Sequence, residues 1–230
     1  MFVLAINTAT NKTSVALAEG GKTVAQAEWP SLRDEAEKLL PNIRKILLKF
    51  KIKPAELDSI AVVTGPGPFT GLRVGVATAN ALAFGLKIPL FAFDVFSMEY
   101  CRISPALVNK TAIVIGAGGQ NYAVKTLTMK IPLILDTEKL ASWFGKNKKI
   151  VSIIANLNQQ DTIRLGGILK VAKLSVKIMP ENKLKSFGDA MTCLLKRKNR
   201  NSWCAKPVYL QKPHITKSKK QVFAASLAGK

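Results

Sequence analysis

Apolar and polar positions follow two different periods along the first fifty residues, and each period predicts a type of element. Short, β-branched apolar runs at 2–7, 13–18 and 23–28 are separated by polar or glycine-rich turns, which predicts three strands joined as an antiparallel meander. From Ala36 to Phe50 the apolar residues recur at helical spacing. The chain is therefore expected to open with a strand meander followed by an amphipathic helix.

The next fifty residues repeat this alternation. The run 59–64 predicts a short buried strand, which the Gly65-Pro66-Gly67-Pro68 loop must end. A second helix is expected from about Thr70 to Phe84, with Gly85 as its stop. The strand 89–93 and a short helix from Asp94 complete a first lobe.

A second hairpin in the later half indicates an internal duplication. Residues 111–115 and 122–127 predict a strand pair around Gly116–Gly119. Further elements are expected as a helix at 137–144, a strand at 150–154, helices within 158–174 and 181–195, and a strand at 208–210. These patterns predict an α/β chain with an N-terminal lobe at 1–103, a smaller C-terminal lobe at 104–211 and a basic mobile tail at 212–230.

Composition narrows the class of protein. The chain has 230 residues and 48% hydrophobic positions, enough for a sizeable core. Its three cysteines lack the spacing of a disulfide framework or a zinc site, and its N-terminus lacks the pattern of a secretory signal. The most apolar stretch, 74–93, is interrupted by polar residues and a proline. We expect a cytoplasmic protein without a membrane segment.

The net charge of +21 is concentrated in the second half of the chain. Residues 1–110 contain 13 Lys and Arg against 9 Asp and Glu, whereas residues 111–230 contain 22 against 5. Such a field attracts phosphate backbones, which favours proximity to RNA. A general drift of surface positions towards lysine would give the same composition, and both explanations stay open.

The glycine-proline loop is a candidate phosphate site. It lies between a strand and a helix start, where backbone N–H groups and the helix dipole attract anions. The residues expected to face a phosphate are Gly65, Gly67, Phe69, Thr70 and Arg73. The spacing matches neither a Walker loop nor a Rossmann fingerprint. A rigid turn that only positions the helix is an equally good interpretation.

Small residues form a stripe along the helix behind this loop. Gly71, Gly75, Ala79 and Ala83 recur every four residues and allow another backbone to approach closely. That backbone would belong to the chain's own sheet or to a partner helix, and core burial is the default for an apolar face.

Candidate catalytic and metal-binding residues are scarce. His214 is the single histidine, and it stands in the basic tail, so neither a metal cluster nor a Ser/His/Asp triad is indicated. The first turn carries Asn7, which cannot supply the charge of an acid that holds a magnesium water. We assign no catalytic residue, no metal and no cofactor of the chain's own.

Three segments together resemble the TsaB (YeaZ) family, the dimerization subunits of the bacterial tRNA threonylcarbamoyladenosine machinery. They are Leu4 to Thr10, the segment Glu37-Lys38-Leu39-Leu40-Pro41, and the run from Gly65 to Gly75, which reads GPGPFTGLRVG. The similarity is strong over residues 1–100 and thinner beyond, where Lys206 to Gln211 resembles the family's closing motif.

The resemblance implies a fold, partners and a role. The fold would be a duplicated actin/Hsp70-like (ASKHA, ribonuclease H-like) fold of two lobes. The chain would be a non-catalytic scaffold that pairs with a TsaD-like catalytic subunit, which threonylcarbamoylates adenosine 37 of ANN-decoding tRNAs. A TsaE-like ATPase and the tRNA would join through the complex, ATP or ADP would bind only at the interface, and the chain would form a homodimer when alone.

In the family, the first two helices supply the partner contact. The corresponding residues here are Leu39, Leu40, Ile43, Leu47, Thr70, Gly71, Val74, Gly75, Thr78, Ala79 and Leu82. This chain departs from the family at Asn7, where Asp is usual, near Glu35, where His is common, and at Gly116-Ala117-Gly118, where an Asp-Ala-Arg-like turn is usual. The last departure favours a reduced second lobe. The alternatives are an ATPase or metallopeptidase of the same fold and a stand-alone basic RNA-binding protein.

Overall fold

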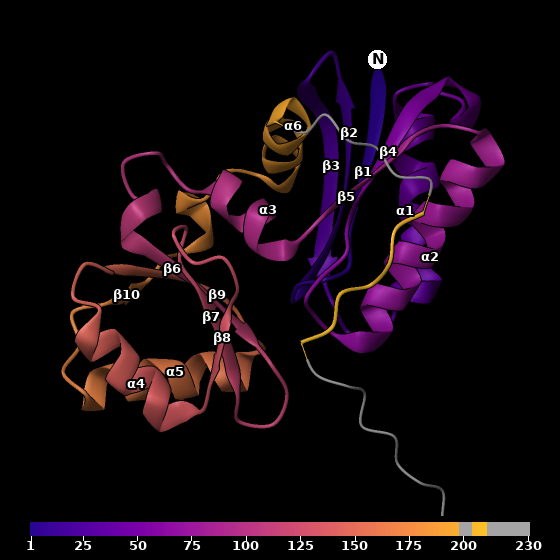
Figure 1. Cartoon of the computed structure of the whole chain (residues 1–230). Helices are drawn as coiled ribbons and strands as arrows, with labels where there is room; N and C mark the ends of the chain where they lie inside the picture. The colour runs from indigo at the N-terminus through magenta and orange to yellow at the C-terminus, as the bar shows by residue number, and fades with distance from the viewer. Residues whose placement is uncertain (198–203, 211–230) are drawn as a thin grey trace, which may run out of the picture.

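The structure, a computed structural model, describes residues 1–197 and 204–210 and consists of two mixed sheets with helices between and around them (Figure 1). Helices α1 (Glu35–Lys49) and α2 (Phe69–Leu86) cover the outer face of the first sheet. Helices α3 (Val95–Arg102) and α6 (Phe187–Arg197) lie on its inner face. Helices α4 (Thr137–Lys146) and α5 (Gln159–Val171) cover the outer face of the second sheet.

The first sheet has the strand order β3-β2-β1-β4-β5. Its strands are β1 (Phe2–Asn7), β2 (Lys12–Glu19), β3 (Lys22–Pro30), β4 (Leu57–Val63) and β5 (Leu90–Phe93). The first three form the antiparallel meander expected from the sequence, and β4 and β5 add in parallel. Strand β1 is central and carries apolar residues on both faces, because helices cover both.

Helix α2 begins directly after the glycine-proline loop and ends at Lys87, whose backbone adopts a left-handed conformation. Gly85 therefore lies inside the helix, although it was expected to stop it. In the part of the chain that the structure describes, α2 is the one helix with the length and apolar composition of a membrane span, and 33% of it is buried. It packs on β4, as the core helix of a folded domain does. The absence of a membrane segment stays a prediction.

The second sheet repeats the order of the first. Its strands are β6 (Thr111–Gly116), β7 (Tyr122–Lys125), β8 (Leu133–Leu135), β9 (Ser152–Asn156) and β10 (Lys177–Ile178). The strand order is β10-β9-β6-β7-β8. If β6 to β10 are counted as first to fifth and the order is taken from β8, it is third, second, first, fourth, fifth, as in the first sheet. The central strand again pairs antiparallel with the next strand and parallel with the fourth. The duplication is confirmed; the second lobe keeps all five strands, with short edges at β8 and β10.

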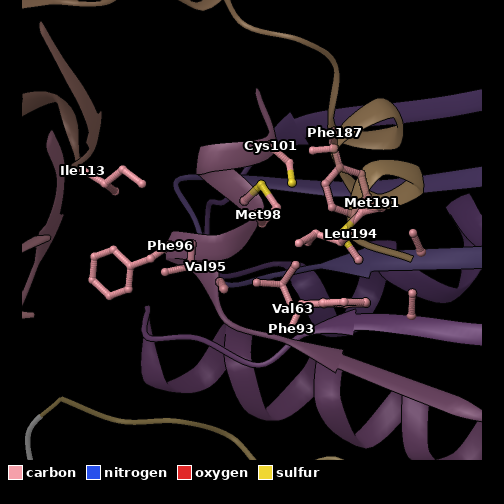
Figure 2. Packing of buried hydrophobic residues seen from close by; sticks show 14 of the residues in the cluster. Val63, Phe93, Val95, Phe96, Met98, Cys101, Ile113, Phe187, Met191 and Leu194 are labelled. Carbon is pink, nitrogen blue, oxygen red and sulfur yellow. The ribbon is translucent and has the colours of Figure 1, made fainter. Parts of the chain in front are cut away.

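The two lobes share one apolar core around α3 and α6. Figure 2 shows Phe96 of α3 extending towards Ile113 of the second sheet, while Met98 and Cys101 face Phe187 and Met191 of α6. Buried residues from both sheets belong to this one cluster. Because the cluster is continuous, apolar packing itself holds the lobes together.

The chain returns to the first lobe after the second sheet. Helix α6 packs on β2 and β3, and Ala205 is buried in the core beneath α1 and α2. The helix expected at 181–195 forms only from Phe187, after the short 3-10 helix η3 (Glu181–Lys183). The strand expected at 208–210 is wrong, because Val208 makes a single ladder-like bond, from its N to Thr64 O at 2.7 Å.

The exact limits of the lobes stay a prediction. The two short 3-10 helices η1 (Pro54–Glu56) and η2 (Val108–Lys110) precede β4 and β6 at equivalent places in the two sheets. The tail expected to be mobile, 212–230, lies entirely outside the described residues.

Candidate functional site

A cleft of about 520 Å³ opens between the two lobes beside the glycine-proline loop. Residues 66–69 form one wall and 9–11 continue it. The opposite wall comes from 115–119 of the second lobe, with Asn156, Leu157, Asn158 and Asp161. Tyr209 and Leu210 also line the cleft. Residues far apart in the sequence are thus brought to one cavity by the duplicated fold.

Close backbone packing explains the glycines of the loop. A Cβ on Gly67 would lie 2.0 Å from Ala9 O, and one on Gly65 would lie 2.6 Å from Val208 O. Gly65 also has a φ of +113°, which disfavours other residues. The loop is therefore pressed against the β1–β2 turn and the C-terminal segment of the same chain, which supports its interpretation as a rigid turn.

An aromatic stack forms at the edge of the cleft. The Phe69 and Tyr209 rings are 4.9 Å apart, and the Arg73 guanidinium lies 3.9 Å from the Phe69 centroid. Arg73 therefore makes a cation–π contact outside the cavity. Of the five residues expected to face a phosphate, Gly67 and Phe69 line the cleft, whereas Gly65, Thr70 and Arg73 do not. Phosphate binding by the loop stays a prediction.

The amide of Asn7 is fully engaged in shaping the turn after β1. It is buried, its Nδ2 donates to Thr10 Oγ1 at 2.8 Å, and its Oδ1 accepts from Ala9 N at 2.9 Å. An aspartate could not donate as this amide does. Asn7 is thus suited to hold the turn rather than to bind a cation.

The actin/Hsp70-like fold implies a nucleotide in this cleft, and the lining does not fit one. A magnesium–triphosphate needs cationic and acidic partners. Among the described residues, the lining contains no Lys or Arg, and the one acid there, Asp161, accepts from Arg164 Nη1 at 2.9 Å. Within residues 1–197 and 204–210, no group of three His, Cys, Asp or Glu side chains could hold a metal ion. We therefore derive no chemistry through a nucleotide here.

A buried polar cluster behind the cleft was not anticipated from the sequence. Glu99 of α3 is fully buried and lies 3.3 Å from Arg102 Nη1, and it accepts from Asn156 Nδ2 at 2.7 Å. Arg102 also contacts Glu181, and its Nε donates to Lys185 O at 2.9 Å. Burial raises the pKa of Glu99, although Arg102 opposes the shift. The cluster ties α3 to two segments of the second lobe.

The outer face of α1 and α2 is the second candidate site. Six of the eleven residues expected to contact a partner are buried within this chain, so their part in a partner contact stays a prediction: Leu39, Ile43, Leu47, Gly71, Gly75 and Ala79. Gly75 shows the reason for the burial, since a Cβ there would lie 2.1 Å from Thr8 Oγ1. The small-residue stripe lets α2 approach the end of β1, which is the self-packing alternative.

The other five residues remain accessible in part or in full: Leu40, Thr70, Val74, Thr78 and Leu82. The structure adds two exposed apolar side chains on the same helices, Leu48 at 64% and Phe84 at 86%. Leu40, Arg44 and Leu48 are four apart and share one helix face, a signal the sequence contained. On α2, the accessible residues Thr70, Val74, Thr78 and Leu82 are thus each one position before a residue of the buried stripe.

Comparisons with known proteins give a family model and relatives named for one tRNA modification. The family model described as TsaD, tRNA N6-adenosine threonylcarbamoyltransferase, matches residues 30–141. The tRNA threonylcarbamoyladenosine biosynthesis protein TsaB of Buchnera aphidicola is 34% identical over 96 residues, 42% of this chain and 45% of that protein. TsaB of Escherichia coli is 37% identical over 90 residues, 39% of this chain and 38% of that protein. The chain thus matches less than half the length of these relatives.

A solved structure extends the similarity to both lobes. YeaZ from Pseudomonas aeruginosa superposes with a TM-score of 0.54 at 22% identity, over 78% of this chain and 99% of that one. This likeness shows the fold, which is the actin/Hsp70-like fold expected from the sequence. The chain is thus similar to relatives named TsaB over part of its length, and it has the fold of YeaZ.

Proposed function

We propose that this chain is an accessory subunit in the biosynthesis of threonylcarbamoyladenosine in tRNA, and that it pairs with a TsaD-like catalytic subunit. The observation that carries the proposal is the similarity of 42% and 39% of the chain to two relatives named for this pathway. The chain itself supplies no nucleotide or metal chemistry in this proposal. The absence of Lys and Arg from the described lining of the cleft and the structural role of Asn7 support that view.

The partner surface proposed is the outward face of α1 and α2. On α1 it carries Leu40, which is 53% exposed, and Leu48, which is 64% exposed. These two leucines lie about one helical turn before and one turn after Arg44. On α2, Phe84 is 86% exposed. Exposed apolar side chains on neighbouring helices favour coverage by another helical surface. The same face explains the homodimer expected in the absence of the catalytic subunit.

The TsaE-like ATPase and the tRNA are proposed to join through the complex formed with the catalytic subunit, and cytoplasmic location follows from this role. Any ATP or ADP would be held where the subunits meet. These partners extend the proposal and depend on the first pairing.

Co-purification with the catalytic subunit tests the pairing. The variant Leu40→Glu/Leu48→Glu should lose the heterodimer on gel filtration, because two carboxylates would be buried in an apolar contact. The matched control is Ile163→Glu/Val171→Glu on α5, where the wild-type side chains are 69% and 86% exposed. This control should retain the heterodimer.

Modification of tRNA provides the functional readout. Cells that lack the chain should lose threonylcarbamoyladenosine, and the wild-type chain and the α5 control should restore it. Normal modification without the chain would refute the role. Magnesium-dependent ATP turnover by the isolated chain would instead support the ATPase alternative.

A further inference from the structure

A second cavity lies on the surface of the second lobe, away from the cleft. It has a volume of about 570 Å³ and opens between η2, the connection that follows β7, and the turn that follows α4. Its lining is polar or basic except for Leu127 and Ile150: Asn109, Thr126, Leu127, Thr128, Lys146, Asn147, Lys148, Lys149 and Ile150. We call this cavity the lysine groove.

The turn that carries the three lysines is held in place from both sides. Asn147 Nδ2 donates to Trp143 O at 2.7 Å, and Ile150 N donates to Asn147 O at 2.9 Å. Ile150 is buried, and the next residue, Val151, donates its N–H to Lys110 O at 2.9 Å. The backbone beneath the lysines is therefore fixed, while the side chains of Lys146, Lys148 and Lys149 are exposed.

Among the described residues, the lining of the groove contains no Asp or Glu that would compensate its positive charge. Residues 104–186 contain 13 Lys and Arg against 4 Asp and Glu. Three of those four acids already pair elsewhere: Asp136 with Lys139, Asp161 with Arg164, and Glu181 with Arg102. An anionic ligand would thus meet a positive surface with few competing carboxylates.

The side-chain types favour a phosphate backbone over a protein. Protein interfaces are enriched in aromatic residues and Arg and depleted in Lys. As far as the structure describes the chain, the lining of the lysine groove contains Lys with Thr and Asn, and no aromatic residue or Arg. Lysine, hydroxyl and amide donors are the groups that contact phosphate and sugar, whereas base stacking on single strands needs aromatic rings.

We propose that the lysine groove binds the phosphodiester backbone of RNA. This inference rests on the proposed function for the identity of the RNA, which is then the tRNA substrate. Because the groove offers backbone contacts alone, it positions the tRNA without reading its sequence. The tRNA would lie across the second lobe while α1 and α2 on the first lobe engage the partner.

Salt-dependent binding of transcribed tRNA to the full chain tests the inference. In Lys146→Glu/Lys148→Glu/Lys149→Glu, three phosphate contacts are lost, so affinity should fall and the slope of log K against log salt should become shallower by roughly 2 to 3. Lys146→Arg/Lys148→Arg/Lys149→Arg should keep wild-type affinity. Two tRNAs with different anticodons should bind equally.

A second triple variant controls for net charge. Lys170→Glu/Lys173→Glu/Lys177→Glu makes the same change on exposed residues of the same lobe outside the groove, and it should bind tRNA nearly as wild type. An equal loss of tRNA affinity in both triple variants would overturn the proposal, because net charge alone would then explain the binding. Unchanged binding in the groove variant would also overturn it, because other segments would then carry the RNA.

Pull-down of the catalytic subunit separates this inference from the proposed function. The groove variant should retain the heterodimer, since the three lysines lie at the end of α4 and in the turn after it, not on α1 or α2. Loss of a protein partner with intact tRNA binding would identify the groove as a protein site and overturn the RNA assignment. A wild-type chain that binds tRNA through the groove yet leaves modification unaffected would refute the proposed function alone.

Discussion

The contact between Gly75 and Thr8 shows how a single position decides which face of α2 is internal. Helix α2 crosses the end of β1 so closely that the Cβ of any other residue at 75 would approach Thr8 Cβ, Cγ2 and Oγ1 within 3.1 Å. Thr8 is β-branched and fully buried, so it has little freedom to move away. The small-residue stripe is thus an internal packing device.

Gly75→Ala should therefore destabilise the chain by about 1–3 kcal/mol, the usual cost of overpacking a closed core. The matched control is Gly85→Ala in the same helix, where an added Cβ would meet nothing within 4 Å. That change should stabilise by up to about 1 kcal/mol, because alanine favours helix over glycine. Urea denaturation of both variants measures the difference.

An unchanged midpoint for Gly75→Ala would contradict the packing of α2 on β1. If stability fell but the remaining folded protein still formed the heterodimer, the partner surface would be the outward face of α1 and α2 and not the small-residue stripe. If Gly75→Ala lost the heterodimer while keeping wild-type stability, the stripe would instead be a contact surface for the partner.

At the scale of elements, periodicity in the sequence was sufficient for the central parts of both sheets. Strands β1, β2 and β4 and helices α1 and α2 were expected within a few residues of their limits, because apolar runs of period 2 and 3.6 are long there. The short edge strands β8 and β10 were missed. Two or three residues, partly exposed at a sheet edge, leave no pattern to detect.

The segment 204–210 illustrates structure that depends on distant contacts. Its last three residues, 208–210, were expected to form a strand, but the segment runs irregularly beside α2. The Asn80 side chain holds it through two bonds, donating to Ala205 O at 2.9 Å and accepting from Ala205 N at 2.8 Å. No local pattern predicts such a bond, because the residues are 125 positions apart.

Asn80→Ala should loosen this segment, because it leaves the N–H and C=O of buried Ala205 without their partner. We expect a loss of about 2 kcal/mol and faster hydrogen exchange at the amides of Ala205 and Val208. The control is Asn42→Ala on α1, whose exposed amide donates only to Lys38 O within the helix. That change should cost less than about 0.5 kcal/mol.

Wild-type exchange rates in Asn80→Ala would show that Val208 and the Phe69–Tyr209 stack hold the segment without Asn80. A large loss in Asn42→Ala would indicate that α1 itself depends on local side-chain bonds.

On the scale of the whole molecule, the packing of two duplicated lobes decides which parts of the site the sequence could predict. The glycine-proline loop was identified because its residues are contiguous. The opposite wall of the cleft and the Glu99 cluster were not identified. The wall comes from the turn between β6 and β7 and from the end of β9, and it faces the loop only when the lobes pack together. The cluster assembles from α3, β9 and η3 in the same way. Sites shared between lobes depend on topology, which local periodicity does not contain.

The Glu99 cluster also decides how tightly the lobes are joined. Arg102 connects the buried carboxylate of α3 to Glu181 in the second lobe. Arg102→Met would leave Glu99 buried without its cation, and breaking such a pair costs on the order of 3 kcal/mol. Adding Glu99→Gln should recover part of this loss, because a neutral amide can still accept from Asn156 without needing a cation.

Fluorescence can show whether the lobes unfold together, because Trp29 lies in β3 of the first lobe and Trp143 in α4 of the second. Each reporter carries Trp203→Phe and one further change, Trp143→Phe or Trp29→Phe, so that a single tryptophan remains. With an otherwise wild-type sequence, the two reporters should give coincident urea transitions. In Arg102→Met the Trp143 transition should move to lower urea than the Trp29 transition, and Glu99→Gln/Arg102→Met should narrow the gap. Coincident transitions in Arg102→Met would instead mean that the shared apolar core around Phe96 and Ile113 couples the lobes by itself.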